Sequence, residues 1–310
     1  MSTWNRTGPI VVEVDGSGEN LRVVDYAVDE ALRSGADLAL VAPYSVRGSY
    51  SPMLPAYSPK STGELADDAV RRAVAHIRHR YGYGVELVAV TSEGSRPKIL
   101  AHAAKDARML VVGRSRSRGP QRLMNTNGHL MLAARSGCPV VVVPMSWKPS
   151  LSDRKIAVGI DGTPLSAEAL EFAFAAAAAR QAELVVVHAG LPAERAWTEQ
   201  DPDDAWISRA DQVLSETLSP WTARFPTVKV TRFLSSRQPA AALIRESAEV
   251  GLVVVGAHSG ALPIDPVARR SVAAMTSPVA IVPHHPTEEE HAKVQERRTA
   301  LSAEFVVPTY

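Results

Sequence analysis

The first 145 residues alternate between short apolar runs and segments whose apolar residues recur at helical spacing. Leu21, Val24 and Val28 share one helix face, and Gly35 stands where that helix should end. Ser61 and Glu64 have capping-box spacing, which predicts a second helix to about residue 80. A third helix is expected from about Pro97 and a shorter one before the last run. The runs with the length of buried strands are residues 10–14, 38–41, 85–90, 109–112 and 140–143.

The second half of the chain repeats this pattern. The stretch IVVEVDGS from Ile10 aligns with IAVGIDGT from Ile156, so that Asp15 falls on Asp161 at an offset of 161 − 15 = 146. Later matches are Leu110–Gly113 with Val253–Gly256, at an offset of 143, and Cys138–Pro144 with Ser277–Pro283, at 139. Three matches in the same order indicate a tandem duplication with a joint near residues 145–153.

Strands that alternate with helices predict an α/β fold with right-handed crossovers. We expect two doubly wound domains, each with a parallel sheet of five strands in the order 3-2-1-4-5. Aromatic residues make up only 5% of the chain. Val-rich strands packed under Ala-rich helices account for that low fraction.

Charge and cysteine content exclude several classes of protein. The net charge is +1, so no overall basic field draws the chain to nucleic acid or an anionic membrane. A single cysteine excludes a disulfide framework and favours the reducing cytoplasm. The most apolar helical run is bounded by Glu171 and Arg180, well short of the roughly 20 residues of a membrane span.

Two loops of each half are expected to meet at the carboxyl edge of the sheet. With the order 3-2-1-4-5, the ligand crevice of such a sheet lies between its first and fourth strands. These loops begin at Asp15-Gly16 and Gly113-Arg114 in the first half, and at Asp161-Gly162 and Gly256-Ala257 in the second. Asp15 can accept a hydrogen bond from a ribose hydroxyl or an adenine amino group. Alternatively, Asp-Gly-Ser only forms the turn and caps the next helix.

The chain resembles members of the universal stress protein family that contain two such domains in tandem. The motifs that carry the resemblance are IVVEVDGS from Ile10, LVVGRSR from Leu110, GCPVVVVP from Gly137, and VVVH, VVVGAH and SPVAIV in the second half. The resemblance covers residues 8–145 and 154–284 as two domains of that family. Residues 285–310 remain as a tail, either a helix on the surface or at a dimer contact, or a disordered segment.

The resemblance implies a nucleotide site whose phosphate loop reads G-x2-G-x9-G-[ST] in the members that bind ATP. The first half keeps Gly113, but Arg116 replaces the second glycine, Thr126 the third and Asn127 the hydroxyl residue. The second half keeps Gly256 but has Ser259 at the second glycine. Counting back from Pro278 places Asp265 and Pro266 at the last two positions of the second loop. A carboxylate there repels phosphate and proline lacks an N–H donor, so both sites are expected to be degenerate, the second more so.

Four arginines on the first loop offer another way to bind phosphate, since guanidinium groups do not need glycine geometry. They are Arg114, Arg116, Arg118 and Arg122. The alternative is a solvated basic loop, or one that pairs with an acidic partner. Contact with nucleic acid is disfavoured because no aromatic platform accompanies the arginines.

The remaining candidates carry weaker signals. Cys138 precedes the last strand of the first half, where a small buried side chain suits packing better than redox chemistry. His188 and His258 stand near the second crevice without partners at metal-ligand spacing, and His284-His285 could bind a metal adventitiously. No nucleophile elbow, Walker lysine or catalytic carboxylate pair is present, so no metal or catalytic residue is assigned.

The sequence therefore favours a non-enzymatic, cytoplasmic stress protein that regulates or senses through degenerate nucleotide sites. One alternative is an ATP- or AMP-binding protein that uses Asp15, Gly113 and the arginines, with slow hydrolysis. Another is a structural interaction protein with no small ligand. The resemblance implies that the last strands associate edge to edge through Val140, Val142, Val279 and Ile281, with further dimerisation of the chain.

Overall fold

The computed structural model describes residues 7–45, 61–114, 120–149, 154–160, 166–189, 204–235, 239–258 and 266–284. The first half, copy one, contains nine described elements. In chain order they are β1 (Ile10–Glu13), α1 (Leu21–Ser34), β2 (Leu38–Tyr44), α2 (Thr62–Tyr81), β3 (Leu87–Glu93), α3 (Arg96–Ala103), β4 (Met109–Arg114), α4 (Pro120–Ser136) and β5 (Val140–Pro144).

The second half, copy two, follows the same alternation. Its elements are β6 (Lys155–Ile160), α5 (Ala167–Arg180), β7 (Glu183–Ala189), α6 (Asp204–Arg224), β8 (Val230–Ser235), α7 (Pro239–Glu246), β9 (Leu252–His258), α8 (Pro266–Ala274) and β10 (Val279–His284). The expected tandem α/β repeat is thus confirmed. The tail, residues 285–310, lies outside the described residues.

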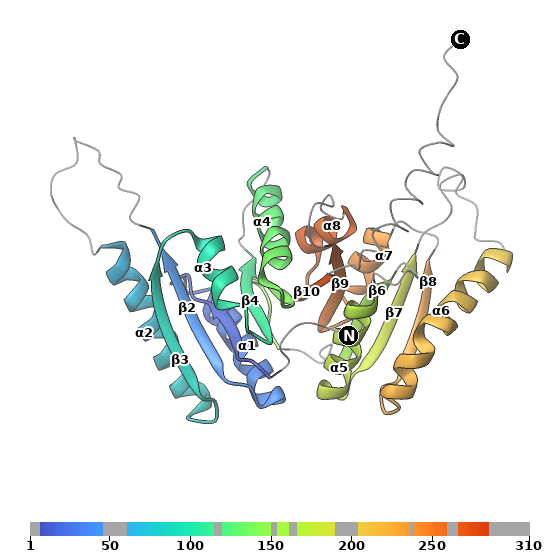
Figure 1. Cartoon of the computed structure of the whole chain (residues 1–310), viewed down its shortest axis with the longest axis horizontal. Helices are drawn as coiled ribbons and strands as arrows, with labels where there is room; N and C mark the ends of the chain where they lie inside the picture. The colour runs from blue at the N-terminus through green and yellow to red at the C-terminus, as the bar shows by residue number, and fades with distance from the viewer. Residues whose placement is uncertain are drawn as a thin grey trace, which may run out of the picture.

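The strands form one continuous sheet in the order β3-β2-β1-β4-β5-β10-β9-β6-β7-β8 (Figure 1). Each half has the expected order 3-2-1-4-5, and all strand pairs within a copy are parallel. The expectation of two five-stranded sheets needs one correction, because the halves are joined into a single ten-stranded sheet.

The joint is an antiparallel pair between the last strands of the two copies. Val142 lies opposite Val279 and Val140 lies opposite Ile281. All four side chains are buried. The pairing covers two apolar strand edges that would otherwise be open to aggregation. It lies within one chain, so association between chains stays a prediction.

Two layers of helices cover the sheet, and each layer runs across both copies. Helices α1, α2, α5 and α6 enclose one hydrophobic core with residues such as Val24, Ile77 and Phe174. Helices α3, α4, α7 and α8 enclose the other with residues such as Leu100 and Val272. The inner strands β1 and β5 are buried along their whole length, which explains their unbroken apolar sequences.

Local signals in the sequence set the helix ends. Ser61 and Glu64 form the expected capping box at the start of α2. Gly35 ends α1 at a φ of 62°, a conformation that favours glycine. Among the described helices, none is both long and apolar enough to span a bilayer.

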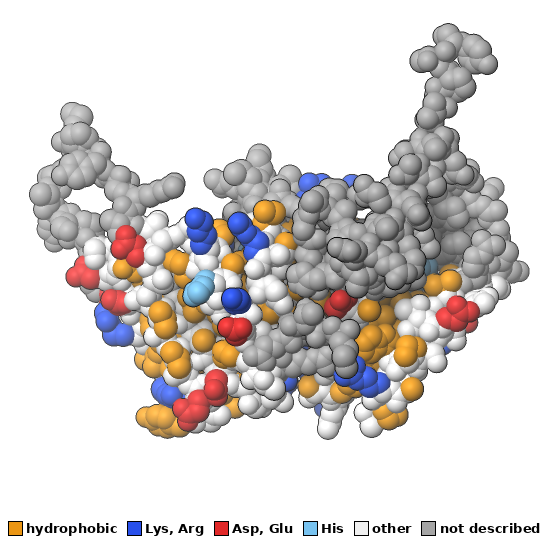
Figure 2. Space-filling model, viewed as in Figure 1, with side chains coloured by type: hydrophobic (Ala, Val, Ile, Leu, Met, Phe, Trp, Pro, Cys, Tyr) orange, Lys and Arg blue, Asp and Glu red, His pale blue; other side chains and the backbone are white. Residues whose placement is uncertain are grey.

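The outer edge of copy one keeps some apolar surface. Val88 and Val90 of β3 are 63% and 48% exposed. Figure 2 shows hydrophobic side chains on this outer part of the molecule, interspersed with acidic and basic ones. The end strand β3 is therefore less buried than the strands near the joint, and it positions no part of the crevice between β1 and β4.

Candidate functional site

The turn after β1 is held together by its own side chains. The Ser17 amide donates to Oδ1 of Asp15 at 2.8 Å, and the Asp15 amide donates to Oδ1 of Asn20 at 3.2 Å. Nδ2 of the buried Asn20 donates in turn to the Glu13 carbonyl at 3.1 Å. Asp15 is exposed at the crevice, but one of its carboxylate oxygens already accepts a hydrogen bond within the turn.

Gly16 is a glycine for two structural reasons. Its φ of 79° lies in the left-handed region, and a Cβ on it would lie 3.1 Å from Cβ of Ala69 in α2. Arg72, one turn further along α2, donates from Nη2 to the Gly16 carbonyl at 3.1 Å. The turn is thus packed under α2.

Gly113, expected to open the phosphate loop, also serves packing. A Cβ at this position would lie 2.7 Å from Cε of Met145 and 3.2 Å from Cγ2 of Val23. Met145 follows β5, and its carbonyl accepts a hydrogen bond of 2.6 Å from Nη1 of Arg22. A side chain at position 113 would require Met145 and Val23 to shift, so packing is one reason for glycine here.

Arg114 reaches into the other copy. Its Nη1 donates to the Val272 carbonyl at 2.8 Å, in the last turn of α8. Carbonyls in the last turn of a helix have no partner within the helix, and a cation is favourable there. Arg114 thus joins the two copies. Whether it also contacts phosphate stays a prediction.

A partly buried ion pair that the sequence did not reveal lies at the carboxyl end of β1. Glu13 is 5% exposed and pairs with Arg96 at the start of α3, in two hydrogen bonds. The one between Nη2 and Oε2 measures 2.6 Å. The signal that could have revealed it is an acidic residue inside a strand that is otherwise apolar.

His129 of α4 lies beside this pair and was also missed. It is 4% exposed, its ring hydrogen-bonds to the backbone of Gly113, and its Nδ1 has no partner among the described residues. Burial, together with the positive charges of Arg96 and Arg114, lowers the pKa of His129 to about 3. The imidazole is therefore neutral at physiological pH.

Copy two lacks this polar group. At the aligned positions it has Gly159 for Glu13 (13 + 146 = 159), Pro239 for Arg96 (96 + 143 = 239), Ala268 for His129 (129 + 139 = 268) and Ala257 for Arg114 (114 + 143 = 257). A Cβ on Gly159 would lie 2.7 Å from Cδ1 of Leu243 in α7. A hydrophobic contact thus replaces the ion pair of copy one.

Several predicted site residues lie outside the described residues. These are Arg116, Arg118, Asp161, Ser259 and Asp265, and the side chains of Arg122, Asn127 and His258. Gly256 is described and pairs with Val282 across β9 and β10.

The other candidates have structural surroundings. Cys138 is 1% exposed, and burial raises the pKa of its thiol to about 12, which disfavours a reactive thiolate. Nδ1 of His188 lies 3.2 Å from the Ile160 carbonyl. No group of three or more His, Cys, Asp or Glu suited to a metal ion occurs in the described part of the chain.

Comparisons with known proteins agree with this fold and this repeat. The model of the Universal stress protein family matches residues 7–144 and again 153–283. A universal stress protein of Mycolicibacterium smegmatis is 32% identical over 292 residues, which cover 88% of this chain and 96% of the relative. One from Mycobacterium tuberculosis is 30% identical over 268 residues, covering 83% and 90%.

A solved structure of similar fold is a universal stress protein from Archaeoglobus fulgidus. Its TM-score is 0.65 at 14% identity, and the match covers 90% of this chain and 98% of that one. The family model matches two segments that together span most of the chain, in agreement with two copies of one strand order. The chain therefore belongs to the universal stress protein family.

Proposed function

We propose that this chain is a non-enzymatic regulatory or sensing protein of the stress response, located in the cytoplasm, whose two nucleotide sites are degenerate. One observation carries the proposal: the polar groups at the carboxyl ends of β1 and β4 are engaged with the protein itself. Glu13 pairs with Arg96, and Arg114 donates to α8.

Titration calorimetry of the full chain with ATP and Mg²⁺ tests this proposal. Degenerate sites predict no saturable binding below the millimolar range, and no ATP hydrolysis above the uncatalysed rate. Submillimolar binding that Asp15→Ala abolishes would overturn the proposal. Asp161→Ala provides a matched control, because it removes the aligned carboxylate from copy two.

A weak adenine-nucleotide site in copy one is the second candidate. It is favoured by the exposure of Asp15 at the crevice and by the 43% exposure of the Arg96 side chain. The base or ribose would be held by Asp15, and the phosphates by Gly113 and the loop arginines. Mass spectrometry of the intact protein under native conditions would detect a nucleotide that co-purifies. Loss of that nucleotide in Asp15→Ala, but not in Asp161→Ala, would support this candidate.

We also propose that the chain associates with a second copy of itself. The edges of β5 and β10 are already paired with each other, so a dimer has to use another surface. Light scattering coupled to size exclusion measures the mass directly. A monomer at micromolar concentration would contradict this part of the proposal.

A further inference from the structure

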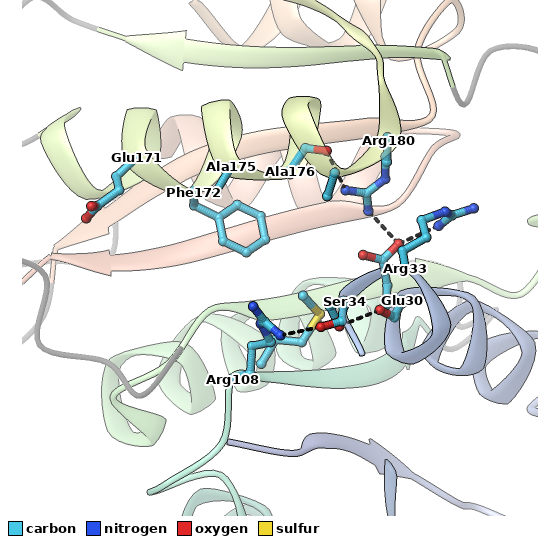
Figure 3. Close-up of a pocket in the computed structure, with 11 residues that line it drawn as sticks. Glu30, Arg33, Ser34, Arg108, Glu171, Phe172, Ala175, Ala176 and Arg180 are labelled. Carbon is cyan, nitrogen blue, oxygen red and sulfur yellow. Dashed lines mark hydrogen bonds and ion pairs between the residues drawn. The ribbon is translucent and has the colours of Figure 1, made fainter. Parts of the chain in front are cut away.

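A cavity of about 100 Å³ lies between the two copies, where α1 and the start of β4 face α5 (Figure 3). A cavity of about 150 Å³ in another protein holds benzene, so this volume admits a molecule of a few carbon atoms. The cavity is separate from the carboxyl-edge crevice, because Arg108 and Met109 stand at the amino end of β4.

The cavity exists because the two facing helices carry side chains of different size. On α5 the lining residues include Ala175, Ala176 and Ala179. The aligned positions on α1 (offset 146) hold Asp29, Glu30 and Arg33. The three alanines do not reach across the interface, so they leave space that larger side chains would fill.

One side of the cavity is apolar. Phe172 of α5 and Met109 of β4 both line it, and each is 7% exposed. In Figure 3 the ring of Phe172 points from α5 across the space toward the side of Arg108. This wall suits an alkyl chain but offers no hydrogen bond.

A positively charged side chain stands beside this apolar wall (Figure 3). Nη1 of Arg108 donates to the Ser34 carbonyl at 3.2 Å, and no acidic side chain of the described residues pairs with this guanidinium. A partly buried guanidinium with donors left over favours an anion, and its planar fork matches a carboxylate.

The carboxylates around the cavity already have arginine partners. Glu30 accepts from Arg180 at 2.6 Å and from Arg33 at 2.8 Å. Glu171 accepts from Arg224 at 2.8 Å. Arg108 therefore carries a positive charge that neither of these carboxylates neutralises.

We propose that this cavity binds a short-chain monocarboxylate of about three to five carbons. Its carboxylate pairs with Arg108, and its alkyl chain lies against Phe172 and Met109. Because the site is built from both copies, the ligand stabilises the packing of α1 against α5. Such a ligand would link a small metabolite to the arrangement of the two halves.

Titration of the full chain with butyrate, followed by calorimetry or ligand-observed NMR, tests the proposal. We expect saturable binding in the millimolar range, as fits a ligand of this size. Butyramide has the same shape without the charge. Its affinity should be lower than that of butyrate by about tenfold or by a larger factor. The proposal would be overturned if butyramide, chloride or phosphate occupied the site as tightly as butyrate. It would also be overturned if butyrate showed no saturable binding.

Two variants separate the charged end of the site from its apolar space. Arg108→Gln should weaken butyrate binding about tenfold, whereas Lys105→Gln, which removes an exposed positive charge three residues away, should leave it unchanged. Ala175→Leu fills the mouth of the cavity from an exposed position and should also reduce binding. Thermal melts of the unliganded variants show whether each is folded. A folded Arg108→Gln that binds butyrate as well as the parent protein contradicts the assignment.

Discussion

The two copies differ at the carboxyl end of their first strands, on the face covered by α3 and α4 or by α7 and α8. Copy one places Glu13, Arg96 and His129 there, whereas the aligned positions of copy two hold Gly159, Pro239 and Ala268. The same strand order thus supports a buried polar group in one half and a purely apolar contact in the other. The difference teaches that the backbone of this fold does not dictate the chemistry beneath its crevice.

The strongest test of this contrast is to move the polar residue into the apolar copy. Gly159→Glu should destabilise the protein by about 4 kcal/mol, because the side chain meets Leu243 and the position aligned with Arg96 holds Pro239. Gly159→Ala adds only the Cβ and should cost about 1 kcal/mol. Urea denaturation followed by circular dichroism measures both values. Equal stability of the two variants would show that the charge is accommodated.

The interface between the copies contains a second ion pair, to which the two halves contribute different residues. Arg180 of copy two is 8% exposed in its side chain and pairs with Glu30 of copy one. Arg180→Met should cost about 3 kcal/mol, since it breaks a buried pair. Arg33→Met removes the other partner of Glu30. The Arg33 side chain is 34% exposed, so this change should cost less than about 1 kcal/mol. Similar losses of unfolding free energy in the two variants would show that the pair between the copies stabilises the protein no more than the exposed pair does.

The ion pair under the crevice of copy one should have a smaller effect, because the Arg96 side chain is 43% exposed. After a discount for solvent screening, Arg96→Met should cost about 2 kcal/mol. The double variant Glu13→Gln with Arg96→Met should cost less than the sum of the single changes. Denaturant titration of all four proteins measures this coupling, and additive losses would mean that the two side chains do not stabilise each other.

The sequence predicted the parts of the structure that depend on local pattern. Apolar runs and helical spacing predicted the alternation of strands and helices in each half, and Ser61 with Glu64 predicted the start of α2. The contacts that define the crevice join distant residues. Arg96 and Glu13 are 83 residues apart in the sequence, and Arg114 and Val272 are 158 apart. No local sequence pattern can therefore predict these contacts.

The alignment of the two halves holds one clue that could have been used. Glu13 stands in a buried strand where copy two has Gly159. A carboxylate in such a strand requires a partner, and an arginine at the start of a nearby helix is a reasonable choice. The identity of that arginine depends on how α3 packs on β1, which only the structure shows.

The smallest expected effect concerns His129, whose pKa is lowered to about 3 in the folded protein against about 6.5 when unfolded. Between these values the unfolded chain binds a proton that the folded protein does not, so stability falls as the pH falls. From pH 7 to pH 5.5 this single group should remove about 1 kcal/mol of stability. Denaturation at the two pH values should show a smaller loss in His129→Leu by that amount.

Copy two supplies the comparison within the same molecule. Its aligned residue, Ala268, does not titrate, so Ala268→Ser should leave the pH dependence as it is in the parent protein. If His129→Leu keeps the full loss of stability between pH 7 and pH 5.5, the acid sensitivity belongs to other groups. If instead the pH dependence of the unfolding free energy is reduced only in His129→Leu, the buried polar group makes copy one the acid-sensitive half. The aligned apolar contact of copy two has no group that can bind a proton.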